Sequence, residues 1–226
     1  MKVLYVFATL LAVVFAAAED ACYKETVSAC KSFGKNLNDP KKCNAKYGAI
    51  EGVLPDLQEY VNAHIIRNFE YMLMSTHYGN YEKNREGFEK LFMDLSDSKW
   101  DKAIDLIKYI TKRGGEMKFG RYKDVDNEEN GGYELYEINS LAKALDIEKS
   151  MANSAFHIHG EATRRREEYH DPEVSSYIEN EFIHKQSKTI RQLSGHVSDL
   201  NQLLNGPDSS LALFIFDEYL KKQSIV

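Results

Sequence analysis

The feature that most constrains this fold is the helical spacing of apolar residues, which continues through nearly all of the chain beyond Leu54. In the first such segment, Leu57, Val61 and Ile65 recur every four residues and so share one face of an α-helix. Three further segments repeat this period, and no Asn-Gly hairpin signal lies between alternating strands. The sequence therefore predicts an all-α protein, with long helices at about 55–79, 84–113, 134–161 and 172–204.

Long amphipathic helices bury their apolar faces by packing together as a bundle. The stretch at 116–132, between the second and third helices, holds acidic residues and glycines with little periodicity. It is too long for a tight turn and suits a crossover connection along the length of a bundle. A shorter helical segment at 209–221 follows Gly206-Pro207. We therefore expect a four-helix bundle with a long crossover between its second and third helices and a short fifth helix.

The first eighteen residues have the pattern of a secretory signal peptide. Lys2 supplies a positive charge, the run at 3–15 is almost wholly apolar, and the alanines at 16–18 offer the small residues that signal peptidase reads. A membrane anchor is the weaker alternative, because this run is shorter than the roughly 20 residues that cross a bilayer. We expect a secreted protein with no membrane span, in three parts: signal peptide 1–18, cysteine-bearing extension 19–54 and helical bundle domain 55–226.

All three cysteines, Cys22, Cys30 and Cys43, lie in the predicted extension. In an oxidising compartment such cysteines form disulfides, and an odd number leaves one without a partner in its own chain. We favour one bridge within the chain and one to another chain; the alternative is one bridge and a free buried thiol. A zinc site is not expected, because the spacings contain no close cysteine pair and no neighbouring histidine.

The charge balance limits the partners of the chain. Its 29 basic residues are outnumbered by 35 acidic ones, which gives a formal net charge of -6 at pH 7. Such a chain has no general positive field for nucleic acid, whereas metal cations and basic partners suit it better.

Five polar residues interrupt the apolar faces near the middle of the predicted long helices. They are His64, Lys99, Lys102, Glu148 and Gln186. An antiparallel bundle would bring them to one interior site, where bundles place metals and cofactors. A di-metal site, however, needs several carboxylates and a Glu-x-x-His pair, whereas Lys99 and Lys102 repel a cation. We expect Lys99 to pair with Glu148, with the other three residues hydrogen-bonded around them, because a buried charge needs a partner.

Several short segments carry a likeness to a known family through their order and spacing. They are Glu-Tyr-Met-Leu-Met-Ser at 70–75, Arg113-Gly114-Gly115, Leu-Asp-Ile-Glu-Lys at 145–149, Asp171-Pro172, Ile178-Glu179, Gly195-His196-Val197, Ser210-Leu211 and Phe216-Asp217. With them the chain resembles ferritin over about 57–220, and specifically the light-chain type of the secreted insect ferritins. Ferritin-like bundles have one long crossover connection, which agrees with the helical period.

The resemblance implies that the five interior polar residues stand where an active ferritin heavy chain holds its ferroxidase ligands. Only Glu148 and Gln186 keep the ligand types, so we expect no catalytic oxidation by this chain alone. The family then implies an iron-storage subunit that co-assembles with ferroxidase-competent heavy chains into a closed shell of 24 subunits around a ferric mineral. The cysteine-bearing extension and an additional stretch at 164–168 depart from the cytosolic pattern and match the secreted branch.

Further candidate iron-handling residues come from two places. Asp94, Asp97 and Asp101 share one face of the second predicted helix. They are either a solvated surface or, as the resemblance implies, a cavity-lining cluster that nucleates the mineral. The resemblance also places His159 and Glu179 near the three-fold channels that admit ferrous ions, although Ser176 stands where a second acidic residue is usual.

Three classes of function remain after these observations. We favour a non-catalytic subunit of a secreted iron-storage shell. The alternatives are a ferroxidase in its own right and a secreted signalling bundle of the cytokine type, which has similar crossovers and length but stays small. Particle size and oxygen consumption with ferrous iron separate the three.

Overall fold

The computed structural model describes residues 22, 24, 26, 43–120, 136–166 and 168–223. The predicted signal peptide at 1–18, Cys30 and the middle of the predicted crossover lie outside these residues. The chain divides into two units, Met1–Ala45 and Lys46–Val226. Within the first unit, Cys22 and Cys43 form a disulfide with their Cα atoms 4.7 Å apart. The expected bridge within the chain is therefore present.

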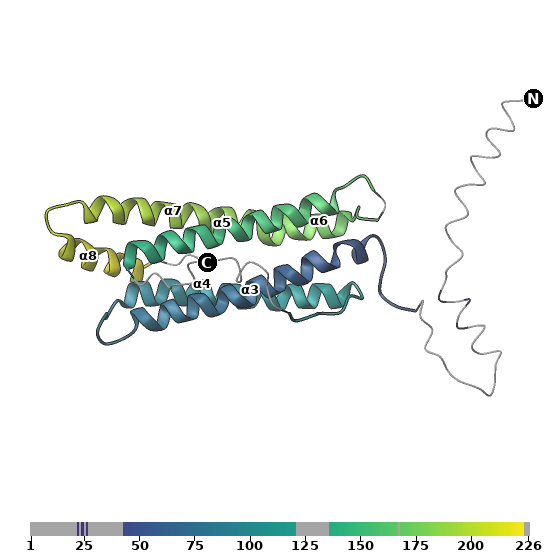
Figure 1. Cartoon of the computed structure of the whole chain (residues 1–226), viewed down its shortest axis with the longest axis horizontal. Helices are drawn as coiled ribbons and strands as arrows, with labels where there is room; N and C mark the ends of the chain where they lie inside the picture. Colours follow the sequence, from purple (N-terminus) through teal and green to yellow (C-terminus); the bar gives the residue numbers. More distant parts are fainter. Residues whose placement is uncertain are drawn as a thin grey trace, which may run out of the picture. The chain divides into compact units, whose positions relative to one another are not determined.

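The second unit is built from long helices. In chain order they are α3 (Ile50–Tyr78), α4 (Glu86–Lys112), α5 (Glu137–Ala162), α6 (Pro172–Ile178), the π-helical turn η2 (Glu179–Ile183), α7 (His184–Leu204) and α8 (Ser209–Lys221). Figure 1 shows α3 beside α4, α5 beside the continuous helix formed by α6, η2 and α7, and α8 packed at one end against α4 and α7. No residue in the described part of the chain lies in a strand. The all-α bundle and its short fifth helix are confirmed.

The first long helix begins earlier than predicted. α3 starts at Ile50 and includes Pro55 as an internal residue, whereas we expected Pro55 at its first position. A proline inside a helix removes one backbone hydrogen bond. The extra turn nevertheless buries Ile50 and Val53 completely, and this apolar burial offsets the loss.

The buried face of α3 also differs from the predicted one in its second half. Ile65, which we placed on this face, is half-buried, whereas Tyr71 and Met74 are buried. The predicted stripe advanced mostly by four residues, and a helix with 3.6 residues per turn rotates such a stripe by about 40° at each step. The true face alternates steps of three and four residues and therefore stays on the core.

Glycines and side chains from other elements close the ends of α4. Gly114 has a φ of 76°, Gly115 N–H bonds to Ile110 O at 2.9 Å and Gly114 N–H bonds to Thr111 O at 3.0 Å, which is the Schellman arrangement. At the other end, the Asp217 carboxylate of α8 accepts hydrogen bonds from the backbone N–H groups of Gly87 and Phe88, both at 3.0 Å. α8 thus supplies the cap that α4 lacks in its own sequence.

The connection that follows α4 begins by running beside α3, in the same direction as α3. The Asn62 side chain donates to Lys118 O at 3.3 Å, and the Gln58 side chain donates to Glu116 O. Glu116 and then Lys118 therefore contact two successive turns of α3. This direction agrees with the predicted crossover, whose next residues, 121–135, lie outside the description.

Candidate functional site

The five interior polar residues come from all four long helices: His64 on α3, Lys99 and Lys102 on α4, Glu148 on α5 and Gln186 on α7. We call this set the polar core site. His64, Lys99, Glu148 and Gln186 are buried, and Lys102 is half-buried. The helix stripes therefore bring these side chains into the bundle interior as predicted.

Lys99 and Glu148 form a buried ion pair at the centre of this site. Lys99 Nζ lies 2.7 Å from Glu148 Oε2, and the two side chains are only 2% and 1% exposed. Tyr71 OH donates a hydrogen bond of 2.9 Å to the other carboxylate oxygen, Oε1. Burial and the adjacent Glu148 raise the pKa of Tyr71 well above its usual value, so the phenol remains a neutral donor. Both oxygens of Glu148 are therefore engaged.

His64 and Gln186 do not join that ion pair, so this part of our expectation is wrong. Gln186 Nε2 lies 3.2 Å from Tyr60 OH, and the Tyr60 ring packs edge-on against His64 with centroids 4.6 Å apart. The Phe182 ring lies 5.5 Å from that of His64 and encloses it further. Neither nitrogen of His64 nor Gln186 Oε1 has a hydrogen-bond partner among the described residues. Apolar rings, rather than the ion pair, surround the imidazole.

Two positive charges remain near one negative charge in this interior. Burial, followed by the repulsion of Lys99, lowers the pKa of Lys102 to about 8, so its amine is mostly charged at neutral pH. Burial and the charges of Lys99 and Lys102 lower the pKa of His64 well below 6.5, and its imidazole is therefore neutral. The polar core site then carries one more positive than negative charge.

This donor set does not fit a catalytic di-iron centre. Iron in such a centre needs several anionic oxygen ligands and open coordination positions. The single carboxylate of the polar core site already accepts from Lys99 and Tyr71. Across the parts of the chain that are described, no group of three or more His, Cys, Asp and Glu side chains is arranged to hold a metal ion.

The three aspartates predicted on one face of the second helix lie on α4. Asp94 is half-buried, whereas Asp97 and Asp101 are exposed. Burial, with a smaller contribution from the charge of Asp97, raises the pKa of Asp94. Asp105, the next acid along, lies 3.7 Å from Lys108 in a surface ion pair. The carboxylates of Asp97 and Asp101 are thus accessible to solvent, and that of Asp94 is partly covered.

His159 and Glu179 are neighbours, and the structure adds a third residue to them. Glu179 Oε2 lies 3.9 Å from His159 Nε2, and Glu179 Oε1 lies 3.7 Å from His184 Nε2. Residues five apart lie about 140° from each other around an α-helix. The π-helical turn η2, closed by a hydrogen bond from His184 N–H to Glu179 O, brings these two to the same side. His184 was missed because the sequence period was taken as α-helical throughout.

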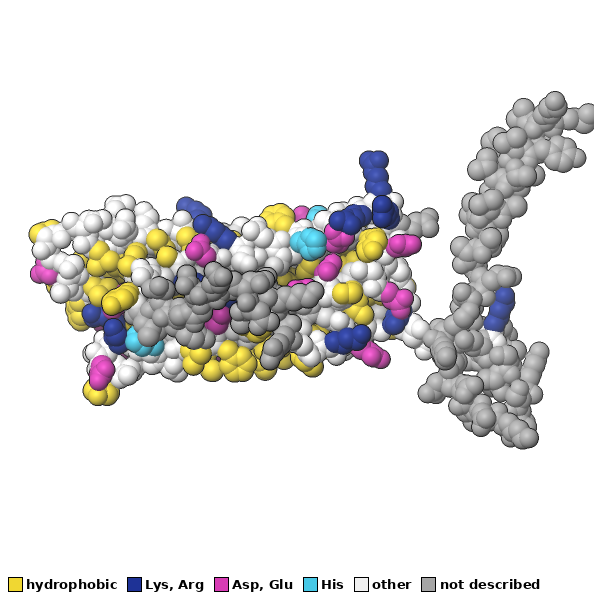
Figure 2. All heavy atoms as spheres, in the orientation of Figure 1, with side chains coloured by type: hydrophobic (Ala, Val, Ile, Leu, Met, Phe, Trp, Pro, Cys, Tyr) yellow, Lys and Arg dark blue, Asp and Glu magenta, His cyan; other side chains and the backbone are white. Residues whose placement is uncertain are grey.

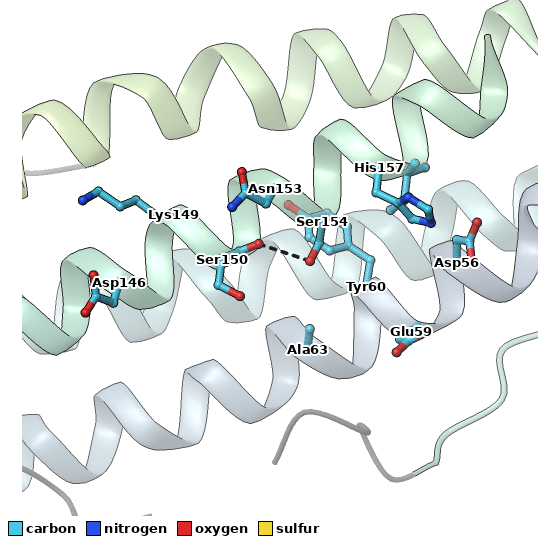
Figure 3. A pocket seen from close by; sticks show the side chains of 11 residues that line it. Asp56, Glu59, Tyr60, Ala63, Asp146, Lys149, Ser150, Asn153, Ser154 and His157 are labelled. Carbon is cyan, nitrogen blue, oxygen red and sulfur yellow. Dashed lines mark hydrogen bonds between the residues drawn. The ribbon is translucent and has the colours of Figure 1, made fainter. Parts of the chain in front are cut away.

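A groove of about 630 Å³ lies between α3 and α5 (Figure 3). Charged and polar residues from both helices line it, among them Asp56, Glu59, Asp146, Lys149 and His157. Tyr60, whose hydroxyl contacts Gln186, also lines the groove. Tyr60 therefore belongs both to the lining of the groove and to the surroundings of Gln186.

Apolar side chains also reach the surface in two places. On the α3–α4 pair, Phe69, Leu73 and Trp100 are 53%, 46% and 47% exposed. On α8, Phe214 and Ile215 are each 55% exposed. Figure 2 shows hydrophobic side chains gathered over α3 and over the end of the bundle that carries α8. Apolar patches of this kind mark surfaces that contact other proteins.

None of the helices in the described ranges combines the length and the apolar character needed to span a bilayer.

Comparison with known proteins places these features in a family. Residues 56–203 match the family model described as the ferritin-like domain. The chain is 44% identical over 220 residues to a ferritin light chain of Trichoplusia ni, with 94% of this chain and 95% of the relative covered. It is 38% identical over 223 residues to a ferritin light chain of Drosophila melanogaster, covering 97% of each.

A solved structure agrees with the sequence relatives. The crystal structure of Trichoplusia ni secreted ferritin matches with a TM-score of 0.82 and 41% sequence identity, covering 90% of this chain and 99% of that one. Fold, family model and relatives over nearly the full length all point the same way. The chain belongs to the ferritin family.

Proposed function

We propose that this chain is the non-catalytic, light-chain-type subunit of a secreted iron-storage shell. In this proposal a ferroxidase-competent heavy chain supplies ferric iron, and the present chain contributes shell surface and mineral-binding carboxylates. The observation that carries the proposal is the Lys99–Glu148 ion pair, a 2.7 Å contact that engages the one carboxylate of the polar core site. Ligands for two iron ions are therefore lacking among these residues.

Exposed apolar surface supports the assembly part of the proposal. The patches on α3–α4 and on α8 expose large aromatic and aliphatic side chains that a monomer in water rarely leaves uncovered. In a closed shell of 24 subunits, each chain contacts several neighbours, and such patches become buried.

The iron-handling residues take two roles in this proposal. Asp94, Asp97 and Asp101 offer closely spaced anionic oxygens, the ligands that hard ferric ions prefer, and nucleate the mineral. His159 and Glu179 lie near a channel for ferrous ions, and His184 joins them through η2. Iron is thus cargo rather than a resident cofactor.

The N-terminal part of the chain completes the proposal. Residues 1–18 direct secretion and are removed, 19–54 form the cysteine-bearing extension, and the bundle domain follows. Cys30, the cysteine outside the Cys22–Cys43 bridge, links the subunit to a heavy chain.

Two measurements on the purified protein test the proposal. Native particles should have a mass of hundreds of kilodaltons, far above the 25.9 kDa of one chain. The isolated chain should consume oxygen with ferrous iron no faster than buffer, and a co-expressed heavy chain should restore rapid consumption. Rapid oxygen consumption by the isolated chain would identify a ferroxidase, and a particle of single-chain mass would identify a monomeric bundle.

A further inference from the structure

Several tyrosine side chains in the described part of the chain are exposed, and one of them differs from the others in its surroundings. The exposed tyrosines are Tyr47, Tyr81, Tyr136 and Tyr219, at 60%, 87%, 69% and 44%. Three of them lie within two residues of a lysine along the chain. Tyr136, by contrast, has no lysine or arginine within six residues on either side. It therefore combines high exposure with a sequence that lacks positive charge.

The sequence around Tyr136 is also strongly acidic. Residues 124–142 include six acidic side chains and no lysine or arginine. Two of these acids, Glu134 and Glu137, lie within two residues of Tyr136. Arg85, from the start of α4, approaches Glu137 at 3.6 Å, but one arginine leaves this stretch with an excess of negative charge. Such a stretch attracts an enzyme whose substrate cleft is basic.

The backbone at Tyr136 is not part of a helix. Tyr136 directly precedes α5 and has an extended conformation, with a φ of −91° and a ψ of 139°. Its carbonyl accepts the first hydrogen bond of the helix, from Ser140 N–H at 2.8 Å. Enzymes that modify side chains act most readily on exposed residues outside regular elements, because a residue inside a helix must first unfold. Tyr136 is extended without any such unfolding.

We propose that Tyr136 is O-sulfated by a tyrosine sulfotransferase of the secretory pathway. The modification rests on the secretion that the proposed function includes, because such enzymes meet only proteins that pass through that pathway. The phenol oxygen of Tyr136 attacks the sulfur atom of a phosphosulfate donor. A new O–S bond forms as the bond between sulfur and the donor's phosphate oxygen breaks. That oxygen keeps the electron pair, and the phenolic proton passes to a base of the enzyme.

Sulfation changes the charge at the start of α5. A sulfate monoester stays ionised throughout the physiological pH range, so Tyr136 would carry a fixed negative charge. The amino end of a helix favours negative charge, and no side chain caps α5 in this structure. The helix end therefore offsets part of the repulsion between the sulfate and the acids near it.

The direct test uses the unmodified full chain, a purified tyrosine sulfotransferase and a radiolabelled phosphosulfate donor. The chain should take up the label, and Tyr136→Phe should lose most of it. Tyr81→Phe is the matched control, because Tyr81 is 87% exposed but lies two residues from Lys83. This control should keep the label of the natural chain. No label in the natural chain, or equal label in Tyr136→Phe, would overturn the proposal.

Cells that secrete the chain provide the second test. Peptides from the secreted protein should show the added mass of one SO₃ group on Tyr136, and a phosphatase should leave that mass in place. Its removal by the phosphatase would identify a phosphate instead and contradict sulfation. The test with purified enzyme reads the site even if the chain is neither secreted nor able to store iron, so a failure of the proposed function is distinguishable from a failure at Tyr136.

Discussion

At the scale of single residues, the interior of the bundle depends on how each buried polar group is satisfied. The Lys99–Glu148 pair was predictable from sequence, because a charge on an inward helical stripe needs a partner of opposite sign. The contribution of Tyr71 was not, since a tyrosine on an apolar face is equally compatible with simple packing. The isolation of His64 among rings was also beyond the sequence, because side-chain packing around Tyr60 and Phe182 decides it.

The Glu148→Gln variant should lose on the order of 3–5 kcal/mol of unfolding free energy, because it leaves the Lys99 ammonium buried without a counter-charge. Chemical denaturation of the two chains measures this loss. The double variant Lys99→Met, Glu148→Gln should recover most of the unfolding free energy that Glu148→Gln loses. In it the uncompensated ammonium is gone, and the introduced amide oxygen still accepts a hydrogen bond from Tyr71.

Glu181→Gln is the matched control for that series. It removes an equally charged residue from an exposed pair with Lys185 and should change the free energy by less than about 1 kcal/mol. Equal losses of unfolding free energy in Glu148→Gln and Glu181→Gln would mean that the interior pair stabilises the fold no more than a surface ion pair does.

His64 should make the fold sensitive to acid. Its pKa in the folded chain lies well below 6.5, because burial and two lysines oppose protonation, whereas the unfolded chain binds a proton near 6.5. Below that pH the unfolded state holds more protons, so stability should fall by up to about 1.4 kcal/mol per pH unit until the folded pKa is reached. His64→Phe should flatten the slope of unfolding free energy against pH between about 6.5 and 5. An identical slope in both chains would exclude His64 as its source.

At the scale of elements, the sequence located helices better than it located their ends. The glycine stop of α4 was predictable, because Gly114 adopts a φ of 76° that other residues avoid. The start of α4 was not, since its cap is the Asp217 carboxylate, 130 residues further along the chain. The π-helical turn also escaped prediction, because an α-helical period fits the apolar residues on both sides of it.

Arg113, in the segment that ends α4, makes buried contacts with two other segments of the chain. Its side chain is 1% exposed and binds Asp171 at 2.7 Å and the carbonyl of Tyr47 at 3.0 Å, with its guanidinium 4.1 Å from the Tyr47 ring. Asp171 in turn accepts from Val174 N–H at the start of α6. One guanidinium thus joins the end of α4, the loop before α6 and the residues that lead into α3.

Gly114→Ala should destabilise the chain by about 1–2 kcal/mol, because alanine is strained in the left-handed conformation that ends α4. Gly195→Ala is the control. Gly195 lies inside α7, and a Cβ there meets no atom within 4 Å, so alanine should stabilise by roughly 0.5–1 kcal/mol. Opposite signs in thermal unfolding support the Schellman assignment; the same sign for both would contradict it.

At the scale of the whole molecule, the chain combines a ferritin bundle with a separate cysteine-bearing unit. The bundle was predictable because long amphipathic helices have few ways to pack. The pairing of Cys22 with Cys43 was not, since three cysteines allow three different single bridges and spacing does not choose among them. The exposed apolar side chains of α3, α4 and α8 were not predictable either, because their exposure depends on how the helices pack.

Cys30 should carry the covalent link to a partner chain. Non-reducing electrophoresis of native particles should show a band of linked heavy and light subunits, and Cys30→Ser should convert it to single chains. Replacing both Cys22 and Cys43 by Ser removes the internal bridge and should leave the linked band in place. Native particles that run wholly as single chains without reductant would refute the link.

Replacing Asp94, Asp97 and Asp101 together by Asn should slow mineral growth, because the amides keep the shape but remove the anionic oxygens that bind ferric ions. Assembled shells with active heavy chains should oxidise ferrous iron at an unchanged rate and form the mineral core more slowly, as followed by absorbance of the ferric product. The single-site control is Asp105→Asn, which changes an acid that already pairs with Lys108. An unaltered rate of core formation in the triple variant would argue for a solvated surface.

The π-helical turn has a consequence for how the length of this chain can change. A π-helical turn takes up one residue more than an α-helical turn without rotating the helix on either side. Deleting one residue within Glu179–Ile183 should therefore restore a plain α-helix and keep Leu193 and Leu200 on the core. The same deletion within α7 would rotate every later residue by about 100° and turn those leucines toward solvent. Glu179–Ile183 is thus the point in this helix where evolution can insert or remove a residue while the bundle stays in phase.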